Sequence, residues 1–423
     1  MSREEARKDL AVSGGKKARE KSWPERGHVG KEEKKAVDAL FDEAIRTGVA
    51  IGYGGPIEEK YCSEFAEFLG GGFADAVNSG TSAVYVALRA LEPAPWSEVI
   101  VGPVTDPGGI MPIPLMNCIP VIADAAPGSF NAGPEQIEAC IGPLTSAIVV
   151  PHILGEPADM KGIMAVAKKH NLPVLEDCAQ SHAATIDGQK VGTFADIAAY
   201  STMFGKHFCT GGQGGIVFTK DEKLALSCRR MSDRGKPFGL PHERGTNVVA
   251  SLNLNLSDLS AAIGSVQLKK LPQIVARRRS LVKGITAGIK DLSTVGVPRL
   301  VPGAEGSYWF WRLELRTENL TVDRATYCTA LAAEGVGFFE RYNYMPHTYD
   351  WFVKRNVFGR PGLPWTSPQY KGDPDRQFPC PNAREAIERC IAINVFESWT
   401  DKEAEDVVRA FTKLEKAFAK EGK

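Results

Sequence analysis

The chain has 423 residues, of which 43% are hydrophobic and 24% are charged, and its formal net charge at pH 7 is +0. This length exceeds what one hydrophobic core usually supports, so two domains of an ordinary globular protein are expected. The balanced charge provides no overall field that would attract nucleic acid or an anionic membrane, and neither is expected as a partner.

The cysteines and the amino terminus indicate a cytoplasmic protein. Nine cysteines are present, without a CxxC pair or a Cys/His cluster at zinc-finger spacing, so we expect reduced thiols and no bound metal. Residues 1–22 are charged and lack the apolar core of a signal peptide, and no run of about 18 apolar residues occurs. We expect residues 1–22 to form a flexible arm, of the kind that can also wrap a partner subunit.

The order of the elements predicts an α/β fold. Helical periodicity runs from about Lys31 to Gly48, and a second amphipathic helix follows a glycine-rich bend. Short β-branched runs then alternate with helical stretches. We expect a helix at 158–171 and strands at 98–101, 119–124, 146–154, 172–177, 196–202 and 214–219. Such alternation is typical of a doubly wound, mostly parallel sheet.

The pattern changes after about Ser280, where a helical run, the aromatic segment SYWFWRLEL and two further helices follow. We expect these helices near 322–334 and 400–417. The chain is therefore predicted to contain a large α/β domain at 23–280 and a small carboxyl-terminal α+β domain at 281–423.

Two charged residues follow strand-like runs. Asp177 closes the run VLED, and Lys206 lies in the loop after the strand at 196–202. In doubly wound sheets ligands bind outside the carboxyl ends of the strands. A lysine amine can hold the aldehyde of pyridoxal phosphate as a Schiff base, and a carboxylate can keep its ring nitrogen protonated. The ordinary alternatives are a surface lysine and a helix-capping aspartate.

Small and hydroxyl-bearing residues surround this pair in the sequence. The turn Ser79-Gly80-Thr81-Ser82 precedes a helix, where free N–H groups, hydroxyls and the helix dipole suit a phosphate. Simple N-capping is the alternative. Ser201 could add another phosphate hydroxyl.

Two residues that follow Asp177 could contact the ring of the cofactor. Ala179 is small enough to let the ring lie flat against it, and Gln180 could donate a hydrogen bond to the phenolic oxygen.

The order of five segments resembles the fold-type I sugar aminotransferases of the DegT/StrS family, from about Trp23 onward. The segments are GTSA, PHILGEPADM, LEDCAQSHAA, YSTMFGKHFCTGGQGG and NLNLSDLSAAIGSVQL. The resemblance implies that Lys206 forms the Schiff base, Asp177 contacts the ring nitrogen and Gln180 the phenolic oxygen. It assigns the phosphate to Thr81, Ser82, Ser201 and Asn253, the last reaching it from a neighbouring subunit.

The same resemblance implies a homodimer with shared active sites. It further implies an aminotransferase that moves an amino group from glutamate or glutamine to a keto-sugar, in particular a nucleotide-linked one, or to a keto-cyclitol.

The sequence departs from the family pattern around the expected pocket. Asp106 stands where an aromatic residue usually stacks on the cofactor, Asn255 replaces a usual arginine, and Gln213 replaces a common acidic residue. We expect altered substrate choice rather than lost catalysis. Asp106 would favour a cationic acceptor beside the cofactor, or it is a turn residue before Pro107.

Three alternative functions remain at this stage. A shift of one residue would make His207 the functional base, as in relatives that dehydrate keto-deoxy sugars. A non-transaminating cofactor-binding protein is the second alternative. A nicotinamide enzyme is the third, but a strand-linked GxGxxG is missing. We expect His152, His182 and the aromatic run 308–311 to belong to the core.

Overall fold

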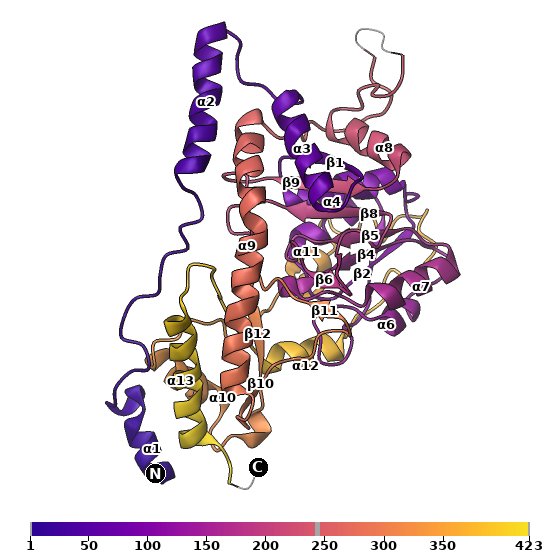
Figure 1. The fold of residues 1–423 in the computed structure, drawn as a ribbon. Helices are drawn as coiled ribbons and strands as arrows, with labels where there is room; N and C mark the ends of the chain where they lie inside the picture. The colour runs from indigo at the N-terminus through magenta and orange to yellow at the C-terminus, as the bar shows by residue number, and fades with distance from the viewer. Residues whose placement is uncertain (1, 242–245, 422–423) are drawn as a thin grey trace.

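The computed structural model describes residues 2–241 and 246–421, and a seven-stranded sheet forms the centre of its larger part (Figure 1). In spatial order the strands are β1 (Phe73–Val77), β9 (Gly215–Thr219), β8 (Ile197–Ser201), β5 (Val174–Asp177), β4 (Thr145–Pro151), β2 (Glu98–Val101) and β3 (Ile119–Ile122). The strands from β8 to β3 pair in parallel, and β9 runs antiparallel to β1 and β8. The predicted α/β class and mostly parallel sheet are confirmed.

Helices cover this sheet on both faces, as its strands require, because β2, β3, β5, β8 and β9 are buried along their whole length. The helices of this part are α3 (Pro56–Phe68), α4 (Gly80–Leu91), α5 (Pro112–Leu115), α6 (Pro134–Glu138), α7 (Met160–His170) and α8 (Glu222–Ser232). Three two-residue strands form a small separate sheet: β6 (Thr185–Ile186), β7 (Gln189–Lys190) and β11 (Ala304–Glu305).

The six predicted strands all exist, and their ends differ by a few residues. Strand β1 was not predicted. Its centre is Asp75, whose buried carboxylate pairs with Arg229 at 2.8 Å, so the sequence shows a charge where a buried strand would show an apolar residue.

The smaller part combines an antiparallel sheet with helices. Its strands are β10 (Val295–Gly296), β12 (Trp311–Leu315) and β13 (Cys390–Ile393), and its helices are α10 (Arg324–Ala333), α12 (Pro381–Arg389) and α13 (Asp401–Phe418). Helix α9 (Asp258–Ile289) spans both parts, because its residues up to Val275 pack in the core of the larger part and those from Leu281 pack in the core of the smaller part (Figure 1). The predicted boundary at residue 280 lies inside α9, so the division into 23–280 and 281–423 stays a prediction.

The amino-terminal segment 1–22, expected as a flexible arm, lies against the smaller part. Helix α1 (Arg3–Asp9) packs beside α13, and the side chains of Ala6 and Leu10 are buried in the apolar cluster that includes α13. The chain then passes α13, where Arg19 pairs with Glu403, and continues to α2 (Lys31–Thr47), which contacts α9 at the edge of the molecule (Figure 1).

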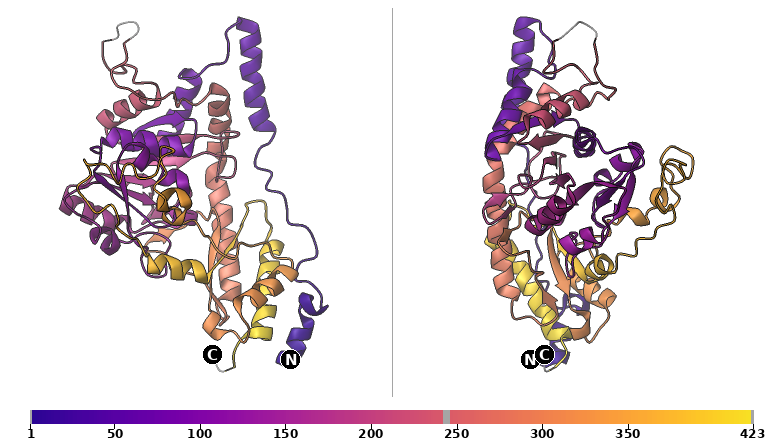
Figure 2. Two further views of the ribbon diagram at one scale, coloured as in Figure 1. Left: turned by 180° about the vertical axis from the view of Figure 1, so that it is seen from behind. Right: turned by 90° about the vertical axis from the view of Figure 1, so that its right-hand side faces the viewer.

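The segment 337–380 contains the short helix α11 (Asp350–Val353) and extends from the smaller part over the larger one (Figure 2). Its residues Tyr342, Met345, Trp365 and Tyr370 are buried in the same cluster as Val104 of the larger part. Within the described ranges, no helix is long and apolar enough to cross a membrane.

Candidate cofactor site

Lys206 lies in the loop between β8 and β9, and its side chain is almost completely buried. Its Nζ atom is 3.5 Å from the centre of the Trp309 ring. Burial lowers the pKa of Lys206 to about 8, against the opposing influence of the nearby carboxylates Asp106 and Asp177. A buried amine with this pKa is partly neutral near physiological pH, as a nucleophile requires.

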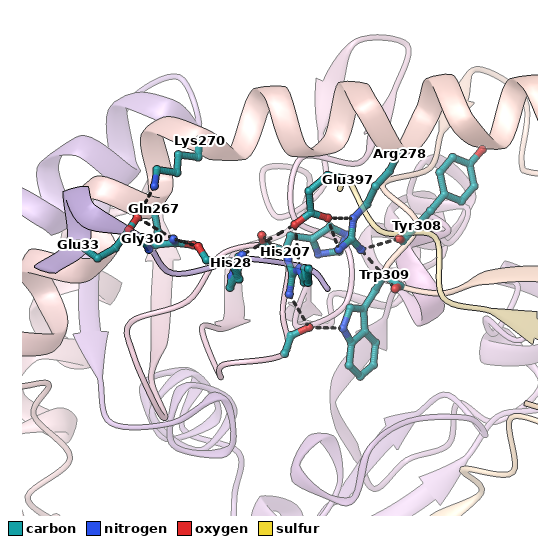
Figure 3. Close-up of polar contacts among 12 residues, drawn as sticks. His28, Gly30, Glu33, His207, Gln267, Lys270, Arg278, Tyr308, Trp309 and Glu397 are labelled. Carbon is teal, nitrogen blue, oxygen red and sulfur yellow. Dashed lines mark hydrogen bonds and ion pairs between the residues drawn. The ribbon is translucent and has the colours of Figure 1, made fainter. Parts of the chain in front are cut away.

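Segments far apart in the sequence hold the backbone of the Lys206 loop (Figure 3). The Lys206 N–H donates to the Met203 carbonyl at 2.9 Å. The Trp309 indole N–H donates to the Gly205 carbonyl at 2.8 Å, and the Arg26 guanidinium donates to the His207 carbonyl at 2.9 Å. The loop therefore has a defined conformation on both sides of the lysine.

Asp177 ends β5, and its carboxylate is buried. Burial raises the pKa of Asp177, while the Ala179 N–H, which donates to Oδ1 at 3.0 Å, and the charge of Lys206 lower it. Across the part of the chain that the structure describes, no ion pair joins Lys206 to Asp177 or Asp106 within 4.0 Å. Lys206 and Asp177 therefore influence each other's pKa without forming an ion pair.

The side chain of Gln180 forms two hydrogen bonds to other segments of the chain. Its Oε1 accepts from the Leu154 N–H at 2.8 Å, and its Nε2 donates to the Tyr342 hydroxyl at 2.9 Å. The first bond fixes the amide orientation, so the second N–H of Nε2 remains as a donor for a ligand.

The hydroxyl-rich turn begins α4 as predicted. Ser79 caps the helix by accepting from the Ser82 N–H at 3.0 Å, and the Ser82 hydroxyl donates to Asn78 Oδ1 at 2.6 Å. Thr81 is exposed. Capping and phosphate binding are compatible here, because the turn keeps an exposed hydroxyl at a helix amino terminus.

Glycines bring the turn next to Ser201 and to the loop after β2. A Cβ atom on Gly80 would lie 2.6 Å from Ser201 Cβ, and one on Gly108 would lie 2.3 Å from Thr81 Oγ1. A Cβ on Gly109 would lie 2.8 Å from Asp177 Oδ2. The structure thus brings Gly80, Thr81 and Ser201 together at one end and places Asp177 next to the loop that also approaches the turn.

Asp106 is a turn residue, and its role toward an acceptor stays a prediction. Its carboxylate is exposed and accepts from the Gly108 N–H at 2.9 Å, which makes it a turn residue. It also lies close enough to Lys206 to oppose the fall in the lysine pKa. An acidic side chain therefore stands where the family pattern has an aromatic ring.

Asn253 lies on the segment that pairs with the start of the turn. The Asn78 N–H donates to the Leu254 carbonyl at 2.8 Å, while the exposed side chain of Asn253 accepts from Asn255 Nδ2 at 2.7 Å. Its role toward a phosphate of another subunit stays a prediction.

The histidines have polar partners inside the fold. His207 contacts the Ser307 carbonyl at 3.1 Å through Nε2 and His182 at 3.3 Å through Nδ1. Burial lowers the pKa of His207 well below its usual value. His152 accepts from the Ala158 N–H and contacts Glu176 at 3.1 Å. These contacts are those of core residues.

Sequence reasoning missed Trp309, Arg26 and Tyr342. Trp309 belongs to an aromatic run whose other tryptophan, Trp311, is indeed buried in the core. Its separation from Lys206 by about a hundred positions left no local signal. Tyr342 follows no recognisable motif, but its hydroxyl is the partner of Gln180.

Comparisons with known proteins identify the family of the chain. The profile of the DegT/DnrJ/EryC1/StrS aminotransferase family matches residues 31–412. The spore coat polysaccharide biosynthesis protein SpsC of Bacillus subtilis is 30% identical over 365 residues, which are 84% of this chain and 89% of that protein. An L-glutamine:2-deoxy-scyllo-inosose aminotransferase of Micromonospora echinospora is 29% identical over 427 aligned residues, covering 96% of this chain and 97% of that protein. The crystal structure of an aminotransferase from Psychrobacter cryohalolentis has a TM-score of 0.80 at 28% identity, covering 92% of this chain and 97% of its own.

Proposed function

The chain belongs to the DegT/DnrJ/EryC1/StrS aminotransferase family, and we propose that it transfers an amino group from glutamate or glutamine to a keto-sugar or keto-cyclitol. It is an aminotransferase whose cofactor is pyridoxal phosphate. When bound, the cofactor supplies an electron sink for chemistry at the carbon that carries the amino group. A similar cyclitol aminotransferase that covers nearly the whole chain supports a cyclitol or sugar as the acceptor.

The buried Lys206 amine beside Asp177 is the observation that carries this proposal. The residues present fit the cofactor, because a lysine and a carboxylate share one buried environment without pairing to each other. The glycines at positions 80, 108 and 109 allow close approach between the turn at the start of α4, the loop after β2 and the ends of β5 and β8. Lys206 would hold the cofactor aldehyde, and Asp177 would hold the proton on the ring nitrogen.

The other residues would orient the cofactor. The Leu154 N–H fixes the orientation of the Gln180 amide, which would then donate to the phenolic oxygen of the cofactor. Ala179, two residues after Asp177, has a small side chain against which the ring would lie. Thr81, Ser82 and Ser201 would bind the phosphate at the start of α4. Asp106 would lie at the edge of the pocket as the charged group nearest to an incoming acceptor.

Lys206 also has a second role in this proposal. Its amine, when free, takes a proton from the reacting carbon and returns it at the next position. A lysine pKa of about 8 suits both directions, because each form is populated at the working pH. The contacts of His207 with Ser307 and His182 disfavour His207 as the base, so a dehydratase is the less favoured function.

We further propose a homodimer with shared active sites. Asn253 is exposed and adjoins the phosphate turn through the neighbouring Leu254. Helix α2 and its flanks expose Phe41, Ile45 and Val49, of which Ile45 is 81% accessible. A second copy of the chain would cover the apolar side chains of α2 and would bring Asn253 to the site of its partner, so it explains both exposed features.

The proposal includes a cytoplasmic location, supported by nine cysteines that are all unpaired.

Two experiments test the proposed function. Borohydride reduction of the holoenzyme followed by peptide mapping should place the reduced cofactor on Lys206, and label on another lysine would overturn the assignment. A panel of ketoses and keto-cyclitols, with glutamate and glutamine as donors, should then identify the acceptor class. Turnover of neither class with either donor would contradict the proposed substrates.

A further inference from the structure

The Lys206 ammonium faces an aromatic ring. Its Nζ atom is 3.5 Å from the Trp309 ring centre, well inside the distance at which a cation is attracted to the face of an indole. In the ranges that the structure describes, the Lys206 side chain forms no ion pair within 4.0 Å. Among the described residues, the ring is therefore closer to the lysine cation than any carboxylate is, and it stabilises the cation directly.

Trp309 itself is held firmly. Its indole N–H donates to the Gly205 carbonyl at 2.8 Å, and its backbone N–H donates to the Leu154 carbonyl at 3.0 Å. Arg278 donates to the Trp309 carbonyl at 3.3 Å and to the Tyr308 carbonyl at 2.9 Å. Hydrogen bonds thus fix both the ring and the backbone of Trp309.

A chain of charges supports Arg278 (Figure 3). Its buried guanidinium pairs with Glu397 at 2.7 Å, and Glu397 also pairs with Arg26 at 2.8 Å. Burial alone would raise the pKa of Glu397. The charges of Arg278 and Arg26 outweigh this effect, and the pKa lies below its usual value. Since Arg26 also donates to the His207 carbonyl, the same network holds Trp309 and the lysine loop.

Trp309 is not a typical core tryptophan. Trp311, two residues along the same run, is fully buried in the apolar cluster of the smaller part, while Trp309 is only partly buried. Packing alone explains Trp311. Packing does not explain why the face of the Trp309 ring lies against Lys206 and why its indole N–H donates to the carbonyl of Gly205, the residue before the lysine.

We propose that Trp309 is a positioning residue for Lys206. Its ring receives the ammonium group whenever the lysine is not bonded to the cofactor, and its N–H fixes the loop that carries the lysine. This inference rests on the proposed role of Lys206 in holding the cofactor. It adds to that role a defined resting position, from which the amine exchanges protons with the reacting carbon.

The groups around Lys206 set the direction of the expected effect. Asp106 from the loop after β2 and Asp177 from β5 favour the ammonium form, and burial disfavours it. His182 is neutral there, because burial and the lysine charge lower its pKa to about 3. Loss of the Trp309 ring removes a group that favours the ammonium form, so the lysine pKa should fall. Simple loosening of the pocket would admit water and raise it instead.

The test measures the pKa of Lys206 in the full-length enzyme after the cofactor is removed. Competitive acetylation over a pH series, followed by peptide mass spectrometry, reports the neutral fraction of this amine. Trp309→Leu and Trp309→Met should lower the pKa by about one unit, a tenfold change in the proton equilibrium. Trp309→Phe, which keeps a weaker ring, should lie between these variants and the wild type.

Trp23 offers a matched control. Its indole N–H donates to the Gly335 carbonyl at 2.9 Å, and the Arg19 guanidinium lies 4.2 Å from its ring. Trp23→Leu should leave the Lys206 pKa unchanged. An unchanged or raised pKa in both Trp309→Leu and Trp309→Met would overturn the inference, as would an equal fall in Trp23→Leu.

Failure of the underlying proposal is recognised separately. If borohydride reduction of the wild-type holoenzyme places no cofactor on Lys206, the role of the lysine is wrong. If the cofactor is on Lys206 and the variant series is flat, only the inference about Trp309 is wrong.

Discussion

The two ends of the proposed cofactor site, the ring end and the phosphate end, differ in how one chain completes them. At the ring end, Lys206, Asp177 and Gln180 are buried, and residues from distant segments hold the surrounding backbone. At the phosphate end, the Ser82 hydroxyl bonds to Ser79 and Asn78 of the same turn, and Thr81 and Asn253 are exposed. The difference is consistent with the proposal that one chain completes the ring end, and that the cofactor and a second subunit complete the phosphate end.

Replacing the lysine should have the largest effect. Lys206→Ala removes the amine that we propose holds the cofactor and moves the proton, so the rate of amino transfer should fall by about 10³-fold or more. Single-turnover absorbance spectroscopy measures the rate, and Lys220→Ala, at an exposed lysine, is the control. A variant that kept full turnover would show that the ring end has another catalytic base.

Asp177→Asn should have the second largest effect. A neutral amide of the same size cannot hold the ring proton by charge, and the loss of such an electrostatic contact lowers rates by about 10²-fold. Rapid kinetics of the half-reaction with glutamate measures this loss. A rate equal to that of the wild type would mean that the buried carboxylate only caps the end of β5.

Asn253→Ala tests the phosphate end. Losing a hydrogen bond to a charged group should weaken cofactor binding by about tenfold or more, because such bonds contribute about 1.5–3 kcal/mol. Equilibrium dialysis of the cofactor measures the change.

A mixture of Asn253→Ala and Lys206→Ala subunits then decides whether sites are shared. If each site takes its lysine from one subunit and its asparagine from the other, a mixed dimer contains one intact site and regains activity. If both residues serve the same chain, mixing restores nothing, and the contrast between the two ends would need another explanation.

Asp106 should give the smallest effect on the reaction. Asp106→Asn removes the charge and keeps an acceptor for the Gly108 N–H, so it separates electrostatics from the turn. We expect a rise in KM of about twofold to fivefold for an amine-bearing ketose and little change for a neutral one, as for the loss of an exposed ion pair. Equal changes for both substrates would leave Asp106 with its turn role alone.

The sequence was sufficient to predict the residues that lie at strand ends and helix starts. Lys206, Asp177 and the turn at the start of α4 are marked by local patterns, and the alternation of strands and helices predicts the sheet that brings them together. Strand β1 escaped prediction because Asp75 interrupts its apolar pattern and finds Arg229 only in the folded chain.

The supporting residues could not be predicted in the same way. Trp309 reaches Gly205 across 104 positions and Arg26 reaches it across 179, and neither has a motif that indicates its partner. Such contacts depend on how the smaller part packs on the larger one, which single-sequence periodicity does not contain.

Helix α9 gives these contacts a mechanical consequence. Its 32 residues span about 48 Å, and it carries Arg278, whose partners Glu397 and Trp309 connect it to the lysine loop. We expect a tilt of this helix to move the loop with it. The ion pair between Arg26 and Glu397 joins the amino-terminal and carboxyl-terminal regions to the same linkage, so we expect a change in either region to displace the lysine from outside the pocket.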